Sequence, residues 1–357
     1  MMKWHVWLAV WIAFPLQAMA AEPDMSEQVP AQDKSTGPMD FIPRELTTIP
    51  AGDFGDNVRR GYELVVNTQQ LKGRYVGNQL NCTDCHLSNG AKAYSAPLWA
   101  AFLAYPAFRA KDNHLDTFAE RVQACFSYSM NGKAPALNSP EVVAISAYSY
   151  WMLMGGLLDK SGMTDTPVPE LTDQQLQQGG NDKSFKLPGP IAQKIEAIGR
   201  RNMPGRGFAT MPAAALPPAP DRGLPVYVQH CAICHGVKGE GTLMGGVPVM
   251  PALWGGDSYN WGAGMHRINT AAFFIFENMP LGKAVQLTPQ QAWDVAAYIN
   301  SQVRPQDPRF TGNVVSTAAA FHRGEQCFYG QTVDGVLLGN ERAPAIYRAP
   351  PGQSPLR

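Results

Sequence analysis

The sequence predicts a mainly α-helical protein built from two small domains that repeat one another. The pentapeptide Cys-x-x-Cys-His occurs at residues 82–86 and again at 231–235. After each copy come a Pro-containing Leu-Trp pair and then an Ala-Tyr pair. The tyrosine follows the motif histidine by 62 residues in the first copy and by 63 in the second. Repetition at matched spacing indicates a duplicated structural unit.

The two pentapeptides are the pattern for covalent attachment of c-type haem. Two residues between the cysteines allow both sulfurs to reach the vinyl groups of one porphyrin, and the adjacent histidine then meets the iron. A pair of redox disulfides would leave both histidines unexplained. We therefore expect two class I cytochrome c-like helical domains, each around one covalent haem. The attachment residues are Cys82, Cys85, Cys231 and Cys234, and the proximal ligands are His86 and His235.

The bulk composition fits a globular protein of about two domains. The chain has 357 residues, 45% of them hydrophobic, with 29 basic and 29 acidic side chains. The positive and negative charges balance, so we do not expect the protein to bind nucleic acid.

Residues 1–20 resemble a secretory signal peptide, with one lysine, a short apolar stretch and a small-x-small cleavage site. Its cleavage places the mature protein in the periplasm, and no later stretch is apolar enough to span a membrane. Residues 21–50 lack apolar periodicity and predict a flexible leader.

The N-terminal cytochrome c domain, with the catalytic haem, is expected over residues 51–165. Helical periodicity runs from Asp56 to Gln70 and from Glu141 to Met154. A Pro-rich linker is expected over residues 166–220. Its last part, residues 211–220, is rich in Pro and Ala and predicts a polyproline spacer.

The C-terminal cytochrome c domain, with the electron-transfer haem, is expected over residues 221–305. Its last helix begins with Thr288-Pro289-Gln290-Gln291, which predicts an N-cap and a capping box. Residues 306–357 predict an irregular tail that contains the isolated Cys327. His114, His230, His266 and His322 lie in predicted loops or beside a motif, so we assign no metal role to them.

The second iron has a clear candidate for its remaining ligand. Met279 lies 44 residues after His235 and precedes a proline. A thioether opposite histidine raises the reduction potential and suits electron transfer. Met244, Met250 and Met265 are the alternatives.

The first iron has two candidate sulfurs. The same spacing from His86 leads to Met130, while Cys125 lies five residues earlier. Three interpretations of Cys125 compete on the residues alone: a thiolate ligand to the iron, a disulfide partner of Cys327, or an inert buried thiol.

Several long strings resemble the dihaem thiosulfate dehydrogenase family. In the first half these are GNQLNCTDCHL, APLWAAFLAYPAFR and TFAERVQACFSYSMNGKAP, and in the second half CAICHG, PALWG, NMPLGKA and AWDVAAYINSQVRPQDPR. The resemblance runs from about residue 56 to 310. It implies that Cys125 ligates the first haem and Met279 the second, although Asn278 stands where a basic residue often precedes that methionine.

The resemblance also implies the reaction. Two thiosulfate ions are oxidised to tetrathionate, and electrons pass through the second haem to an external acceptor cytochrome; the reverse reaction is physically possible. Because two dianions repel, the site needs cations. We expect Arg121 and Lys133 beside Cys125, Ser129 as a hydrogen-bond donor, and Arg109 and Lys111 as further candidates.

Two rival functions use the same haem motifs. A dihaem electron carrier without substrate chemistry would ligate both irons by histidine and methionine, through Met130 and Met279. A dihaem peroxidase would need one haem with an openable sixth position. The sequence does not reveal the physiological acceptor or the oligomeric state.

Overall fold

The computed structural model describes residues 44–109, 111, 113–156, 170–177, 203, 205–282, 286–324 and 326–340. The predicted signal peptide lies outside these residues, as do most of the leader, much of the linker and the end of the tail. Among the described residues, no helix combines the length and the apolar character needed to cross a membrane.

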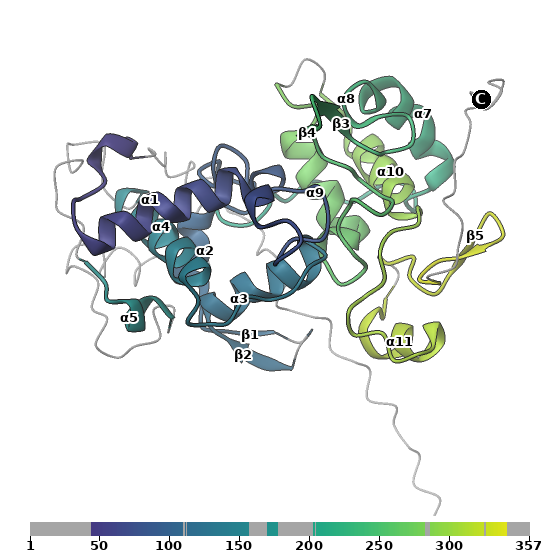
Figure 1. Cartoon of the computed structure of the whole chain (residues 1–357). Coiled ribbons are helices and arrows are strands. Elements are labelled where there is room, and N and C mark those ends of the chain that lie inside the picture. Colours follow the sequence, from purple (N-terminus) through teal and green to yellow (C-terminus); the bar gives the residue numbers. More distant parts are fainter. Residues whose placement is uncertain are drawn as a thin grey trace, which may run out of the picture.

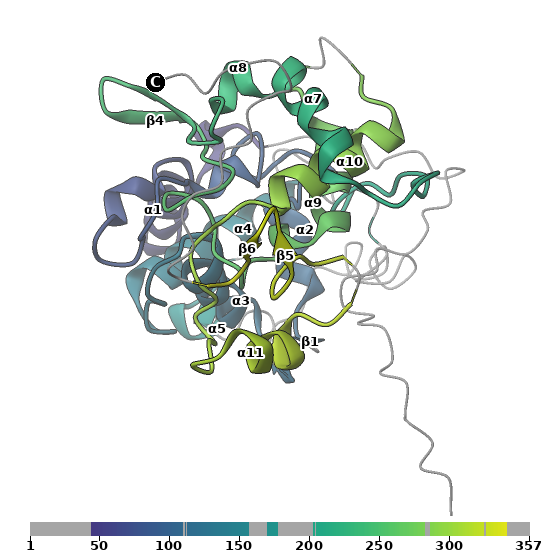
Figure 2. The ribbon, with the colours of Figure 1, turned by 90° about the vertical axis from the view of Figure 1, so that its right-hand side faces the viewer.

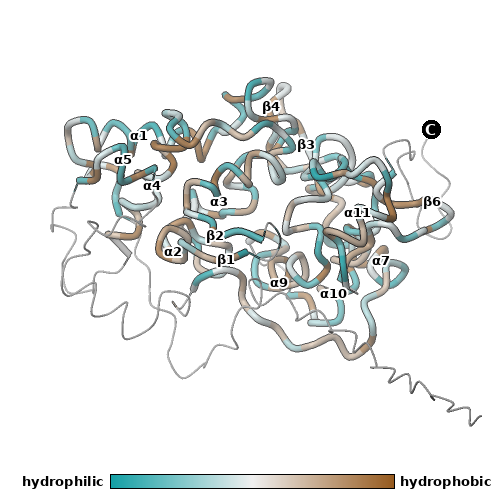
Figure 3. Tube along the Cα trace, turned by 90° about the horizontal axis from the view of Figure 1, so that it is seen from below, coloured by the Kyte–Doolittle hydropathy of each residue, from teal (hydrophilic) through white to brown (hydrophobic). Residues whose placement is uncertain are grey.

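The described chain forms two helical lobes that lie side by side (Figure 1). The first lobe contains α1 (Asp53–Val66), α2 (Leu98–Ala104), β1 (Ala107–Arg109), β2 (His114–Asp116), α3 (Phe118–Ala124), α4 (Pro140–Gly156) and α5 (Asp173–Gln177). The second lobe contains α7 (Pro220–His230), α8 (Ala232–His235), β3 (Thr242–Met244), β4 (Val247–Met250), α9 (Ile268–Asn278) and α10 (Pro289–Asn300). Seen from below, α1, α4 and α5 lie at one end of the molecule and α7 at the other (Figure 3).

The remaining elements are short helical turns and a C-terminal unit. The turns are Leu46–Thr48, Thr68–Leu71, Cys82–Asp84, the π-helical Cys125–Ser129 and Gly264–His266. The C-terminal unit contains α11 (Val314–Phe321), β5 (Thr332–Val333) and β6 (Val336–Leu337). The strands pair only into three antiparallel two-stranded ribbons, so the described fold is mainly α, as predicted.

Each lobe is built on one close helix crossing, and each crossing has a glycine at its centre. A Cβ added to Gly61 of α1 would lie 2.0 Å from the Ala144 carbonyl oxygen of α4. A Cβ added to Gly223 of α7 would lie 2.0 Å from the Asp294 carbonyl oxygen of α10. The two crossings therefore repeat one another in atomic detail, which agrees with the duplicated unit predicted from the spacing.

The predicted capping box at the start of α10 is present. Thr288 Oγ1 accepts a hydrogen bond from the Gln291 amide at 3.2 Å, and Gln291 Oε1 accepts one from the Thr288 amide at 2.9 Å. The two bonds satisfy amides that the first helical turn leaves without partners. The predicted helices of the first domain correspond to α1 and α4, with boundaries shifted by a few residues.

The end of the predicted linker is bound to both lobes. The Trp293 indole of α10 donates a hydrogen bond to the Pro212 carbonyl at 3.1 Å, which holds the Pro-rich segment against the second lobe. Further upstream, the Tyr94 amide of the first lobe donates to the Gly205 carbonyl at 2.7 Å. Gly205 has φ +82°, a conformation that favours glycine. The segment from 205 to 219 therefore joins the lobes rather than merely spanning the distance between them.

Residues 306–324 and 326–340 of the predicted irregular tail contain a helix and a two-stranded ribbon, which the sequence did not predict. Asn313 caps α11, because its side-chain oxygen accepts from the Val315 amide at 2.8 Å and the Ser316 amide at 3.1 Å. The β5–β6 ribbon follows α11, and this C-terminal unit lies beside the second lobe (Figures 1 and 2). Its apolar residues pack on the buried Trp261 ring. The sequence pattern missed this unit because its small core depends on a tryptophan remote in the chain.

The two glycines at the helix crossings provide a test of the fold. We expect Gly61→Ala and Gly223→Ala each to lower the free energy of unfolding by about 2 kcal/mol, because the new methyl group meets a backbone carbonyl that cannot move away. Gly256→Ala is the control, since a Cβ there meets no atom within 4 Å. Urea unfolding of the haem-loaded protein measures the differences. Equal stability of all three variants would contradict the close crossing.

Candidate active site

The first Cys-x-x-Cys-His turn is held in place by short polar side chains. The Cys82 amide donates to Thr68 Oγ1 at 3.0 Å, at the end of the region that contains α1. Ser95 Oγ donates to the Cys85 carbonyl at 2.9 Å and accepts from the Leu87 amide at 3.2 Å. Thr68 and Ser95 are fully buried. Protein side chains therefore hold this turn in place on both sides.

His86 points its free nitrogen toward Cys125. The Nδ1 atom of His86 lies 2.5 Å from the Ala96 carbonyl oxygen. A carbonyl only accepts, so Nδ1 carries the proton and Nε2 retains its lone pair. Cys125, at the first residue of the π-helical turn after α3, makes a side-chain hydrogen bond with His86. The imidazole and the thiol thus face one another.

This arrangement fits a c-type haem. Two attachment thiols lie beside an imidazole with a free nitrogen, and a further sulfur faces that nitrogen, which is the donor set for a six-coordinate haem iron. Burial raises the pKa of Cys82 and of Cys85 to about 12, so both are neutral thiols in the unattached chain. The proton on His86 Nδ1 fixes the tautomer that binds a metal through Nε2.

Cationic side chains surround the Cys125 thiol. Burial alone would raise its pKa, but the charge of Arg121, the side-chain hydrogen bond with His86 and the charge of Arg109 lower the pKa to about 6. The thiolate is therefore the favoured form at neutral pH in this electropositive setting. A site that stabilises one anion in this way also attracts other anions.

The predicted cations do not contribute equally. Arg121 and Arg109 both act on Cys125, and Arg109 is further held by the Tyr105 hydroxyl at 3.3 Å and by Asp116. Lys133, by contrast, is exposed, beyond the turn that carries Cys125. Lys111 donates to the Gly262 carbonyl and lies over the Tyr128 ring at 3.9 Å. The two arginines are consequently the principal cations near the thiol.

Met130 packs in the core just after the turn that carries Cys125, and Ser129 is bound through its carbonyl, so the role of its hydroxyl stays a prediction. Met130 is buried, with 3% of its surface exposed, and belongs to the hydrophobic core of the first lobe. The Ser129 carbonyl accepts a hydrogen bond from the Asn78 side chain at 2.8 Å. Cys125 and Cys327 are both free, so the alternative disulfide between them does not form in this structure.

The second Cys-x-x-Cys-His turn follows the same plan but is more exposed. His235 Nδ1 lies 2.9 Å from the Pro251 carbonyl oxygen, which again leaves Nε2 free. Cys234 is exposed, and Ile233 beside it is 88% exposed. This turn therefore lies at the protein surface.

Met279 lies near the second turn, as predicted for a ligand. It directly follows α9 and packs on the same hydrophobic cluster as Cys231. Met211 packs on the same cluster. Met244 is 72% exposed on β3, and Met265 packs against the core of the first lobe. Asn278 is buried and donates to the Tyr94 carbonyl at 3.3 Å, so it links α9 to the first lobe.

Two buried asparagines close the junction around the Cys125 turn. Asn260 Nδ2 donates to the Ser127 carbonyl at 2.9 Å and to Asn131 Oδ1 at 3.0 Å. Asn78 Nδ2 donates both to the Ser129 carbonyl and, at 3.2 Å, to the Ser258 carbonyl. Sequence reasoning missed both residues, because a single asparagine in a loop carries no periodic signal. They became identifiable only once the second lobe lay against the first.

Comparisons with known proteins match a cytochrome family model to part of the second lobe and match thiosulfate dehydrogenases to most of the chain. The model of the cbb3-type cytochrome c oxidase subunit III matches residues 218–299. The thiosulfate dehydrogenase of Stutzerimonas stutzeri (strain A1501) is 42% identical over 327 residues, which cover 90% of this chain and 93% of that protein. The enzyme of Thiomonas intermedia (strain K12) is 38% identical over 338 residues, covering 94% and 95%.

The chain belongs to the thiosulfate dehydrogenase family.

A solved structure supports the same assignment. The thiosulfate dehydrogenase TsdBA from Marichromatium purpuratum superposes with a TM-score of 0.68 at 42% identity. The match covers 84% of this chain and 57% of the TsdBA chain. As a thiosulfate dehydrogenase family member with a matching cytochrome c domain, the chain is an oxidoreductase that carries c-type haem.

The junction asparagine provides a test of the site. We expect Asn260→Ala to lower the free energy of unfolding of this thiosulfate dehydrogenase family member by about 2 kcal/mol, because the half-buried Ser127 carbonyl and Asn131 side chain lose their donor. Gln70→Ala is the matched control: its side-chain amide also makes two hydrogen bonds, but both are exposed and local. Denaturant unfolding of both haem-loaded variants decides. If Asn260→Ala lowers the free energy of unfolding no more than Gln70→Ala does, the stabilising contact between Asn260 and the Cys125 turn is contradicted.

Proposed function

We propose that the protein oxidises two thiosulfate ions to tetrathionate at a first haem ligated by His86 and Cys125, and passes the electrons to a second haem ligated by His235 and Met279. The observation that carries this proposal is the Cys125 thiol, which faces the haem-motif histidine and is flanked by Arg121 and Arg109. A plain electron carrier has no use for an activated thiol and two cations beside its iron. The names of the relatives supply thiosulfate as the substrate.

The first step joins one thiosulfate to Cys125. The Cys125 thiolate and the terminal sulfur of thiosulfate form an S–S bond, which gives a cysteine S-thiosulfonate and releases two electrons. The charge balances, since a monoanion and a dianion give a monoanion and two electrons. Each c-type haem, when bound, accepts one electron. Arg121 and Arg109 hold the sulfonate oxygens and offset the repulsion between the two sulfur anions.

The second step releases the product. A second thiosulfate attacks the outer sulfur of the Cys125 adduct, its new S–S bond completes tetrathionate, and the Cys125 thiolate leaves. This step is thiol–disulfide exchange, and a leaving thiol with a low pKa departs faster. No net oxidation occurs here, so the two electrons of the first step account for the whole reaction. The same steps in reverse describe tetrathionate reduction.

The exposed second turn is the proposed exit for electrons. Cys234 and Ile233 lie at the surface, whereas the Cys125 turn is closed by the second lobe. An external acceptor cytochrome can therefore approach the second haem more closely than the first. The signal-like residues 1–20 place this exchange in the periplasm.

Replacing the two candidate sulfurs separates the enzyme from the electron carrier. We expect Cys125→Ala to lower thiosulfate oxidation more than about 1,000-fold, because both steps use its sulfur. The thiolate-ligated low-spin signal of the oxidised first haem is lost as well. Met130→Leu is the matched control and keeps both, because Met130 only packs in the core. A ferricyanide-coupled assay and electron paramagnetic resonance on samples with equal covalent haem measure the outcome. Two methionine-ligated haems in the wild type would sink the proposal.

Single substitutions that remove one positive charge test which cations bind thiosulfate. We expect Arg121→Gln to lower kcat/KM for thiosulfate by about 100-fold, because it removes the nearest charge that stabilises both Cys125 and a bound dianion. Lys133→Gln is expected to have a much smaller effect, since Lys133 is exposed, and the exposed Lys72→Gln is the control. A larger loss in Lys133→Gln than in Arg121→Gln would reverse this ranking.

A further inference from the structure

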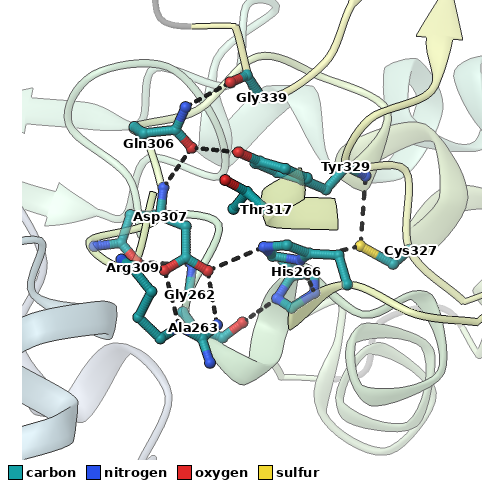
Figure 4. Close-up of polar contacts among 12 residues, drawn as sticks. Gly262, Ala263, His266, Gln306, Asp307, Arg309, Thr317, Cys327, Tyr329 and Gly339 are labelled. Carbon is teal, nitrogen blue, oxygen red and sulfur yellow. Dashed lines mark hydrogen bonds and ion pairs between the residues drawn. The ribbon is translucent and has the colours of Figure 1, made fainter. Parts of the chain in front are cut away.

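Away from the haem motifs, a buried cluster gathers two histidines and the sixth cysteine. The cluster contains His266, from the turn before α9, His322, from the end of α11, and Cys327. None of the three exposes more than 6% of its surface. No metal role was predicted for either histidine, because their loops lie far apart in the chain. The tertiary structure brings all three residues together where the tail meets the second lobe. Figure 4 shows His266 and Cys327 in this region.

The spacing of the donor atoms matches one metal ion. His322 Nδ1 lies 3.4 Å from His266 Nε2 and 3.5 Å from Cys327 Sγ, and the three donor atoms all lie within 4.8 Å of one another. Imidazole nitrogen binds zinc at about 2.0–2.1 Å and thiolate sulfur at about 2.3 Å. Two such donors on one tetrahedral ion lie about 3.3–3.6 Å apart. Two of the three edges of the cluster therefore match the edge lengths of a coordination polyhedron.

Each histidine donates its ring proton to an oxygen outside the cluster, so its other ring nitrogen points a lone pair into the cluster. His266 Nδ1 lies 2.5 Å from the Ala263 carbonyl oxygen and must carry the proton, so Nε2 has the lone pair. His322 Nε2 lies 3.0 Å from a carboxylate oxygen of Asp307, which leaves the lone pair on Nδ1. A carboxylate or carbonyl behind a histidine is the usual support of a metal-bound imidazole.

Without a metal ion, the three side chains have too few protons to form hydrogen bonds among all of their donor atoms. The Cys327 thiol can donate its single hydrogen to His322 Nδ1, and His266 Nε2 then faces another acceptor without a donor. Charging His322 would provide a second proton. However, Arg309 already neutralises Asp307 through a 2.7 Å ion pair. A cation at the centre meets all three donors at once.

We propose that His266, His322 and Cys327 bind one zinc or copper ion. Imidazole together with thiolate is the donor set that these two metals share. The ion would tie α11 and the following turn to the second lobe, in addition to the apolar contacts around Trp261. Its role is independent of thiosulfate chemistry, because none of its ligands belongs to either haem motif.

Metal analysis of the full-length, haem-loaded protein tests this site, with haem iron as the internal standard. We expect about one zinc or copper ion per chain in the wild type, either as purified or after incubation with Zn²⁺ or Cu⁺. Cys327→Ser is expected to lose at least nine-tenths of it. His114→Ala is the matched control. It removes the exposed member of a second group of donors, His114, Asp116 and Glu120, and the metal content should stay unchanged.

X-ray absorption at the zinc and copper edges identifies the ion and reads its ligands without interference from haem iron. We expect two nitrogen neighbours at about 2.0 Å and one sulfur at about 2.3 Å. This measurement uses the wild type, so it holds even if Cys327→Ser folds poorly. Adding the ion should raise Tm in the metal-stripped wild type and leave Tm of Cys327→Ser unchanged. A wild type that binds neither ion, a spectrum without sulfur, or equal metal in Cys327→Ser would overturn the proposal.

Discussion

The contact between the Cys125 turn and the 257–263 segment of the second lobe is the interaction on which the candidate site depends. The turn is π-helical, so its carbonyls are not all satisfied within the first lobe. Asn260 of the second lobe donates from its side chain to the Ser127 carbonyl and from its amide to the Tyr128 carbonyl at 3.2 Å. Asn78 of the first lobe connects the Ser129 carbonyl to the Ser258 carbonyl of the second lobe. Buried carbonyls without donors are costly, so the second lobe stabilises the conformation that aims Cys125 at His86.

The duplicated fold explains why one lobe can carry chemistry and the other electron transfer. Both lobes share the glycine-centred helix crossing and the histidine whose Nδ1 is held by a carbonyl. The lobes differ in the side chain that lies near the histidine and in how exposed the Cys-x-x-Cys-His turn is. The first presents a thiol among arginines beneath a covering lobe, and the second presents a surface turn with Met279 near its core. Changes in one loop of a common scaffold thus separate the proposed roles.

Much of the fold and part of the site could be predicted from the chain. The motif spacing, the helices α1, α4 and α10 and the capping box at Thr288 are local or periodic features, and the structure agrees with them. Arg121 was expected beside Cys125 because one helical turn separates them. Lys133, eight residues after Cys125, is exposed, and its contact with the substrate stays a prediction.

By itself, the sequence determined the haem-attachment motifs, the repeat and the family resemblance, because these depend on residue types at fixed spacing. Only the tertiary structure decided which residues meet across the chain. It joined Asn260 to the Cys125 turn, ordered the tail around Trp261, and buried His266 and His322 beside Cys327. Each of these contacts joins loops distant in sequence. Their register is set by how the two lobes and the tail pack, and single polar residues in loops carry no periodic signal of that packing.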